Sequence, residues 1–129
     1  MKEKTKLKTV ALLICGIALN IGMHLLLSAS TAGPIVNQGI SFNQIFPGIT
    51  LVNLGLSGML LYWFWQAPNW GTGLMISGAL SNLFDRIVRG GVVDYWKIPA
   101  TGIFNNINDW LIAAGVVILI KNLWTKRNS

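Results

Sequence analysis

The chain has 129 residues, of which 53% are hydrophobic and only 11% are charged. This composition is too apolar for an ordinary soluble domain and indicates an integral membrane protein in contact with lipids. The formal net charge of +6 does not indicate nucleic-acid binding, because seven of the ten basic residues lie in the two tails. Those seven are Lys2, Lys4, Lys6, Lys8, Lys121, Lys126 and Arg127. We therefore expect no nucleic-acid partner.

Four apolar segments follow one another, each close to the ~20 residues that cross a bilayer as a helix. They cover residues 9–27, 47–65, 71–88 and 107–124. We therefore predict an all-α membrane protein, a single domain over residues 1–129 with four transmembrane helices. An even number of crossings puts both basic tails on one side of the membrane. The positive-inside rule predicts that this side is the cytoplasm, in a multi-pass protein of the plasma membrane.

The first apolar segment also resembles a secretory signal peptide, because it follows a lysine-rich start and ends in Ser-Ala-Ser-Thr-Ala. It is longer than the about 7–15 apolar residues of such a peptide, and it contains Asn20 and His24. We therefore expect it to remain as the first span. It also holds the single cysteine, Cys15, which we expect to be a small buried apolar residue rather than a nucleophile.

Two connections on the predicted outer side contain strand-like pieces. One is Ile-Val-Asn-Gln-Gly-Ile-Ser-Phe at residues 35–42, and the other is Val-Val-Asp-Tyr-Trp at residues 92–96. Both are rich in β-branched or aromatic residues. The sequence therefore predicts a small extracytoplasmic β-cradle built from these two pieces.

Three of the four acidic residues lie close together, at positions 85, 94 and 109, at the outer ends of membrane segments. Ionisable groups at membrane depth are costly and usually mark a functional site. Asn82, Asp85 and Arg86 share one helical face, because they are three and four residues apart. A charge-balanced helix end is an equally good interpretation of Asp85 and Arg86.

Asn106 and Asp109 share a face at the start of the fourth segment. Asn105 or Asn106 could simply be the N-cap of that helix. Asp94 follows a Gly-Gly turn, and the loop after it is long enough to bring Asp94 and Asp109 together. Two close carboxylates share a proton, so that one activates water while the other polarises a carbonyl. An ion or proton relay remains an alternative use of the same carboxylates.

The spacing of these residues resembles that of the type II signal peptidases, the lipoprotein signal peptidases of bacteria. The family pattern Asn-x-x-Asp-Arg, then Gly, then Val-x-Asp-aromatic is matched from Asn82 to Tyr95. A second pattern, Phe-Asn-x-x-Asp, is matched by Asn106 and Asp109, with Phe104 displaced by one residue. A third pattern, Asn-x-Gly followed by small residues and Phe, is matched by four residues in the first outer connection. They are Asn37, Gly39, Ser41 and Phe42.

The resemblance implies an intramembrane aspartyl endopeptidase with no metal and no cofactor. Its substrate would be a diacylglyceryl-modified prolipoprotein, cut before the lipidated cysteine, and a monomer would suffice. Asp94 and Asp109 would be the catalytic pair at a site that opens toward the outer face. The remaining residues of the pattern would bind substrate or support the site: Asn37, Asn82, Asp85, Arg86 and Asn106.

The first segment departs from the family, which usually has an acidic residue there and a basic residue four positions later. Asn20 and His24 occupy those places. A neutral hydrogen-bonded pair could replace the ion pair, but we expect His24 to be an interior or interfacial histidine with one local partner. Besides the relay, a catalytically silent relative that binds lipoprotein precursors remains possible in principle, although both aspartates are present.

Overall fold

The computed structural model describes residues 3–38 and 48–128. Within this part the chain forms four helices, α1 (Glu3–Ser30), α2 (Ile49–Gln66), α3 (Trp70–Arg89) and α4 (Ile107–Arg127). Each helix lies over one predicted segment, but α1 begins six residues earlier than expected, and α1 and α4 each end three residues later. Gly39, Ser41 and Phe42 and the expected start of the second span at Pro47 lie outside the described residues.

Two of these helices are long and apolar enough to cross a membrane by length and composition, over Leu7–Ser30 and Ile107–Arg127. Large apolar side chains are exposed along the helices, for example Leu19 at 75% and Trp70 at 77%. Exposed apolar surface of this extent is typical of a face that contacts lipid or another protein. Cys15 is exposed on α1, so the expectation that it is buried is wrong.

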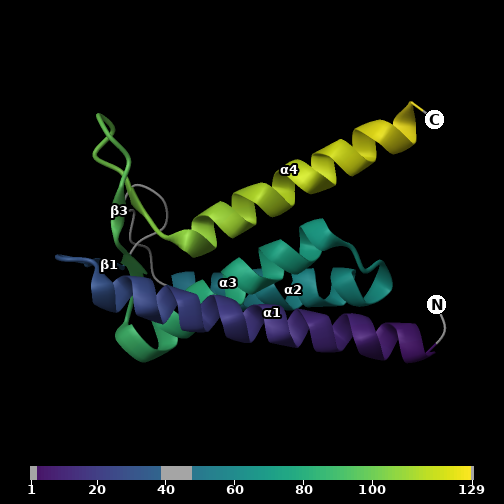
Figure 1. Cartoon of the computed structure of the whole chain (residues 1–129), viewed down its shortest axis with the longest axis horizontal. Coiled ribbons are helices and arrows are strands. Elements are labelled where there is room, and N and C mark those ends of the chain that lie inside the picture. The colour runs from purple at the N-terminus through teal and green to yellow at the C-terminus, as the bar shows by residue number, and fades with distance from the viewer. Residues whose placement is uncertain (1–2, 39–47, 129) are drawn as a thin grey trace.

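The four helices run lengthwise beside one another, with α3 in contact with all three others (Figure 1). A small core joins α2 to α3 through Leu60, Phe64 and Ile76. Between α3 and α4 the backbones approach closely, since a Cβ atom on Gly115 would lie 2.5 Å from the carbonyl oxygen of Gly71. Small residues allow such close helix packing in membranes, where apolar side chains gain little by leaving lipid.

The strands lie at one end of the bundle, and α1 begins and α4 ends at the opposite end (Figure 1). Strand β1 (Ile35–Asn37) pairs antiparallel with β2 (Val92–Asp94), so that Ile35 lies opposite Asp94. Strand β3 (Trp96–Lys97) pairs antiparallel with β4 (Phe104–Asn105). The first three residues of each predicted strand-like piece, 35–37 and 92–94, therefore lie side by side.

The second piece is not one continuous strand, as the sequence suggested. It divides at Tyr95, whose backbone N–H donates to the carbonyl oxygen of Asn105. The chain changes partner there, from β1 on one side to β4 on the other. Asp94 and Tyr95 therefore lie where the two small sheets meet, close to the start of α4.

Candidate functional site

Asp94 lies at the end of β2 and is only 3% exposed. Gly90 is the C-cap of α3, with a φ of 76° in the left-handed region that glycine adopts most readily, and the chain then turns into β2. The two carboxylate oxygens of Asp94 have different partners. Asn106 Nδ2 donates to Oδ1 over 2.7 Å, and Asn37 Nδ2 donates to Oδ2 over 3.1 Å.

Burial raises the pKa of Asp94 to about 6, and the negative charge of Asp109 acts in the same direction. The hydrogen bonds from Asn37 and Asn106 and the proximity of His24 oppose this rise. A carboxyl group with this pKa can hold or release a proton near neutral pH. Asp94 is therefore suited to acid–base chemistry.

Asp109 is the third residue of α4 and forms a capping box with Asn106. Its Oδ2 accepts from the Asn106 backbone N–H over 3.3 Å, and Asn106 Oδ1 accepts from the Asp109 N–H over 3.1 Å. Asp109 Oδ1 accepts from Asn82 Nδ2 over 3.2 Å. The N-cap interpretation of Asn106 is thus confirmed, and the same side chain also binds Asp94.

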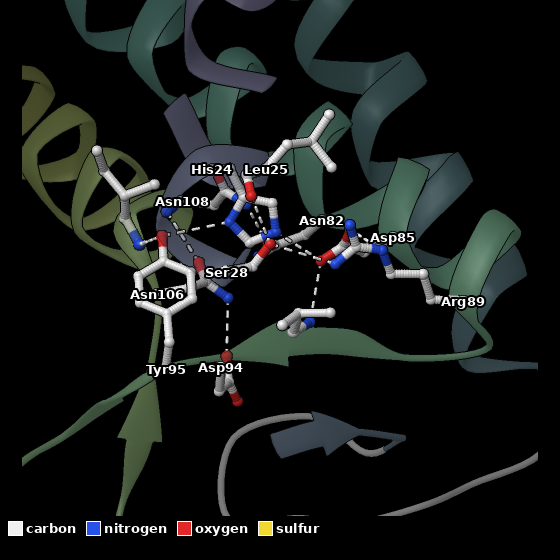
Figure 2. Close-up of polar contacts among 12 residues, drawn as sticks. His24, Leu25, Ser28, Asn82, Asp85, Arg89, Asp94, Tyr95, Asn106 and Asn108 are labelled. Carbon is white, nitrogen blue, oxygen red and sulfur yellow. Dashed lines mark hydrogen bonds and ion pairs between the residues drawn. The ribbon is translucent and has the colours of Figure 1, made fainter. Parts of the chain in front are cut away.

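Asn106 connects the two carboxylates directly. Its Oδ1 caps α4 while its Nδ2 donates to Asp94, and the side chain is fully buried (Figure 2). A single asparagine therefore holds one aspartate from β2 and one from α4. The charge of Arg86 on α3 also acts on both aspartates. The structure thus brings together Asn37, Asn82, Arg86, Asn106 and the two aspartates.

A chain of amides extends from this point toward α1. Asn82 Oδ1 accepts from Asn108 Nδ2 over 2.9 Å, and Asn108 Oδ1 accepts from Asn20 Nδ2 over 2.9 Å. Asn108 is fully buried, and the sequence analysis did not single it out. Its signal was available as the third amide of Asn-Asn-Ile-Asn-Asp, inside an otherwise apolar segment.

Asn20 and His24 have separate partners, which contradicts the alternative that they pair with each other. Asn20 donates to the carbonyl oxygen of Ser77 over 3.2 Å and to Asn108, whereas His24 contacts Asp85 and Tyr95. His24 is interior, as expected, but its two partners come from other elements rather than from its own helix. The physical reason is that a buried carboxylate is a stronger hydrogen-bond partner than a neighbouring amide.

Asp85 is fully buried and makes more contacts than a charge-balanced helix end would need. His24 Nε2 lies 2.6 Å from Asp85 Oδ2, and Arg89 Nε lies 3.7 Å from Asp85 Oδ1. The backbone N–H of Val93 also donates to Oδ2 over 2.9 Å. Asp85 therefore ties α1 and α3 to β2, one residue before Asp94 (Figure 2).

A cavity of about 420 Å³ opens beside Asp94. It is bounded by β1, including Asn37, and by the hairpin residues 101–104. A larger and mostly apolar cavity of about 600 Å³ lies between α1, α3 and the start of α4, and Asn20 and Ser77 reach it. Among residues 3–38 and 48–128, no group of three or more His, Cys, Asp or Glu side chains is arranged to hold a metal ion.

Comparisons with known proteins identify a family for this chain. Residues 19–125 match the family described as signal peptidase (SPase) II. Proteins of Brucella ovis and Brucella canis named lipoprotein signal peptidase are each 33% identical in an alignment 106 residues long that covers 70% of this chain. The chain spans 66% of the length of these relatives.

Two solved structures share the fold. One, a bacterial membrane enzyme at 2.3 Å resolution, has a TM-score of 0.76 and 17% identity, and the match covers 92% of this chain and 90% of that one. Another, at 1.9 Å resolution, has a TM-score of 0.66 and 20% identity, with 88% and 93% covered. Both were solved by the in meso method. From the match over residues 19–125, the chain belongs to the signal peptidase II family.

Proposed function

We propose that this chain is a membrane aspartyl endopeptidase that removes signal peptides from diacylglyceryl-modified prolipoproteins by cleaving before the lipidated cysteine. The observation that carries the proposal is the sharing of Asn106 by Asp94 and Asp109. The names of the Brucella relatives support the substrate class. The mechanism needs neither a metal nor a cofactor, and a monomer suffices for it.

In this mechanism the two aspartates share one proton. One carboxyl of the pair keeps the proton and polarises the scissile carbonyl, while the other, ionised, takes a proton from the attacking water. Asn82 and Asn106 hold the carboxylates, and Arg86 balances the remaining charge. Asn37 lies on the wall of the cavity beside Asp94, where it can donate to the substrate backbone.

We further propose that all four helices cross the membrane, with both chain ends in the cytoplasm and the strands on the outer side. The helices lie lengthwise together, and the basic residues of the last turn of α4 lie at the end opposite the strands (Figure 1). In this orientation the two small sheets form an outer cradle beside the catalytic pair. A signal-peptide helix must unwind locally to be cut, which leaves its backbone N–H and C=O groups without partners. The asparagine side chains of the site can form hydrogen bonds with these groups at the membrane boundary.

The test is cleavage of a purified diacylglyceryl-modified prolipoprotein, followed by mass spectrometry of the products. The wild type should cut before the lipidated cysteine, whereas Asp94→Asn and Asp109→Asn should be inactive with unchanged helix content. The same precursor without the lipid serves as the substrate control. Robust cleavage by either variant would show that Asp94 and Asp109 are not the catalytic pair. No cleavage by well-folded wild type would favour the catalytically silent relative or the charge relay.

A further inference from the structure

Tyr95 joins the two elements that carry the aspartates. It follows Asp94 directly in the chain, and its hydroxyl accepts a hydrogen bond from the backbone N–H of Ile107 over 3.0 Å. Ile107 is the first residue of α4 and lies between Asn106 and Asp109. Its N–H is one of the groups at a helix start that have no partner within the helix. The Tyr95 hydroxyl therefore fixes the start of α4 relative to the end of β2.

The partners of Tyr95 also determine the direction of the hydrogen bonds. Burial raises the pKa of the Tyr95 hydroxyl, which therefore keeps its proton. Since the oxygen accepts from Ile107, the hydroxyl proton is free to be donated to His24 Nδ1, 3.3 Å away. His24 then carries its own proton on Nε2 and donates it to Asp85 Oδ2 over 2.6 Å. This assignment satisfies every donor of the series.

Asp85 is itself held firmly at the far end of this series. It is fully buried and accepts from the N–H of Val93, and Arg89 lies near its second oxygen. A carboxylate that accepts from one imidazole nitrogen fixes the tautomer and orientation of the ring. The opposite nitrogen of His24 is then presented as an acceptor, and it orients the Tyr95 hydroxyl.

We propose that Tyr95, oriented by His24 and Asp85, is a positioning residue that sets the separation between Asp94 and Asp109. Nothing in the series touches the reacting atoms, so its effect is exerted on the geometry of the pair. The role deepens the proposed function and rests on it. It also gives a purpose to His24, which occupies a place where the family usually has a basic residue.

The kinetic test uses variants that remove one contact each. Tyr95→Phe removes only the hydroxyl. In His24→Asn the amide can take the place of Nδ1 and accept from Tyr95, whereas in His24→Gln it takes the place of Nε2 and reaches only Asp85. We expect Tyr95→Phe and His24→Gln to lower kcat about tenfold, as for the loss of one neutral hydrogen bond, with KM within about twofold.

His24→Asn should keep kcat within about threefold of wild type even if it unfolds at a lower temperature, since it loses the Asp85 contact instead. The double variant His24→Gln/Tyr95→Phe should be no slower than Tyr95→Phe alone, because both changes remove the same contact. Losses of kcat that follow thermal stability across all four variants would mean a purely structural role and would overturn the proposal.

A second test needs no turnover. The chain contains only three aspartates, Asp85, Asp94 and Asp109, so carboxyl-labelled aspartate gives three carbon-13 signals in detergent micelles. Two interacting carboxyls titrate in separated steps, and the interval between the steps shrinks as the groups move apart. The other titratable or charged groups around the pair are His24 on α1 and Arg86 on α3, besides Asp85 and Tyr95. They are unchanged in Tyr95→Phe apart from the lost hydroxyl.

We expect the interval between the Asp94 and Asp109 steps to narrow by about 0.5 pH unit or more in Tyr95→Phe. An unchanged interval would overturn the positioning role while leaving the catalytic pair intact. Independent titration of the two aspartates in the wild type would show that they do not share a proton. That result would overturn the proposed function as well.

Discussion

The two ends of the bundle are held together by different interactions. At the strand end, α1, α3 and α4 meet through side chains that would be costly to bury without partners, including His24, Asp85, Asn106 and Asn108. Toward the opposite end, α2 meets α3 through apolar side chains and α3 meets α4 through facing glycines. Close packing alone is thus sufficient to associate these helices.

This difference indicates what the polar end is for. Each buried amide or carboxylate there needs a hydrogen bond in order to be tolerated, and partial satisfaction is worse than an apolar contact. Helix association does not require that arrangement, because the other end associates without it. The polar side chains are therefore explained by the chemistry of the site rather than by stability, and changes at the two ends should have different consequences.

The largest effect on activity short of the aspartates themselves is expected at Asn106. Asn106→Ala removes the donor to Asp94 and the cap of α4 together. We expect a loss of about 10³-fold in kcat/KM, equivalent to about 4 kcal/mol, and a loss of about 1 kcal/mol in stability from the cap. Cleavage assays and thermal unfolding measure the two losses separately.

The adjacent asparagine provides the control for that change. Asn105 is also buried, but among the described residues its side-chain oxygen has no hydrogen-bond partner. Asn105→Ala leaves the hydrogen bonds of Asn106 to both aspartates in place and should therefore lower kcat/KM less than about threefold. Equal losses at Asn105 and Asn106 would show that the polar end does not depend on the particular contacts of Asn106.

At the opposite end, Gly115→Ala should destabilise the fold by about 1–3 kcal/mol, as overpacking usually does. The added Cβ would lie 2.5 Å from both the Gly71 carbonyl oxygen and Met75 Cγ. Gly58→Ala on α2 meets nothing within 4 Å and should be neutral or stabilise by up to about 1 kcal/mol. Thermal unfolding in micelles checks both, and equal stability of the two variants would contradict the close α3–α4 contact.

The response to pH should distinguish the polar end from the rest of the molecule. Asp94 has a raised pKa of about 6, and the proposed mechanism needs one proton shared between Asp94 and Asp109. The active form is therefore present below that pH and is lost as the pH rises through it. We expect kcat/KM to fall about tenfold per pH unit above pH 6–7. A flat profile from pH 6 to 9 would show that activity does not depend on a proton shared by the two aspartates.

Most of this arrangement could be predicted from the sequence, for a specific physical reason. Segments with the period and length of a membrane helix identify themselves locally, and so do residues three or four apart on one face, such as Asn82 and Asp85 or Asn106 and Asp109. The Gly-Gly turn and the β-branched residues after it likewise indicated β2. These features depend on neighbours in the chain.

The features that were missed depend on partners far away in the chain. His24 meets Asp85 across 61 residues, and Asn20 meets Asn108 across 88. Two polar residues four apart on α1 looked like partners for each other, because nothing in the sequence states which other element faces each of them. The division of the strand at Tyr95 has the same cause, since it follows from the change of partner between β1 and β4.

The smallest effect is expected at Cys15, which lies on the same helix as His24. The two residues are nine positions apart, which places them on opposite faces of α1 at 100° per residue, and Cys15 is exposed whereas His24 is fully buried. Cys15→Ser should change the stability by less than about 0.5 kcal/mol and leave kcat/KM unchanged, because the side chain contacts neither end's packing nor the site. Parallel cleavage and unfolding measurements on Cys15→Ser and His24→Gln compare the two faces directly. A large loss of activity in Cys15→Ser would show that the thiol contributes to the reaction. Activity would then depend on both faces of α1 and not only on the face that carries His24.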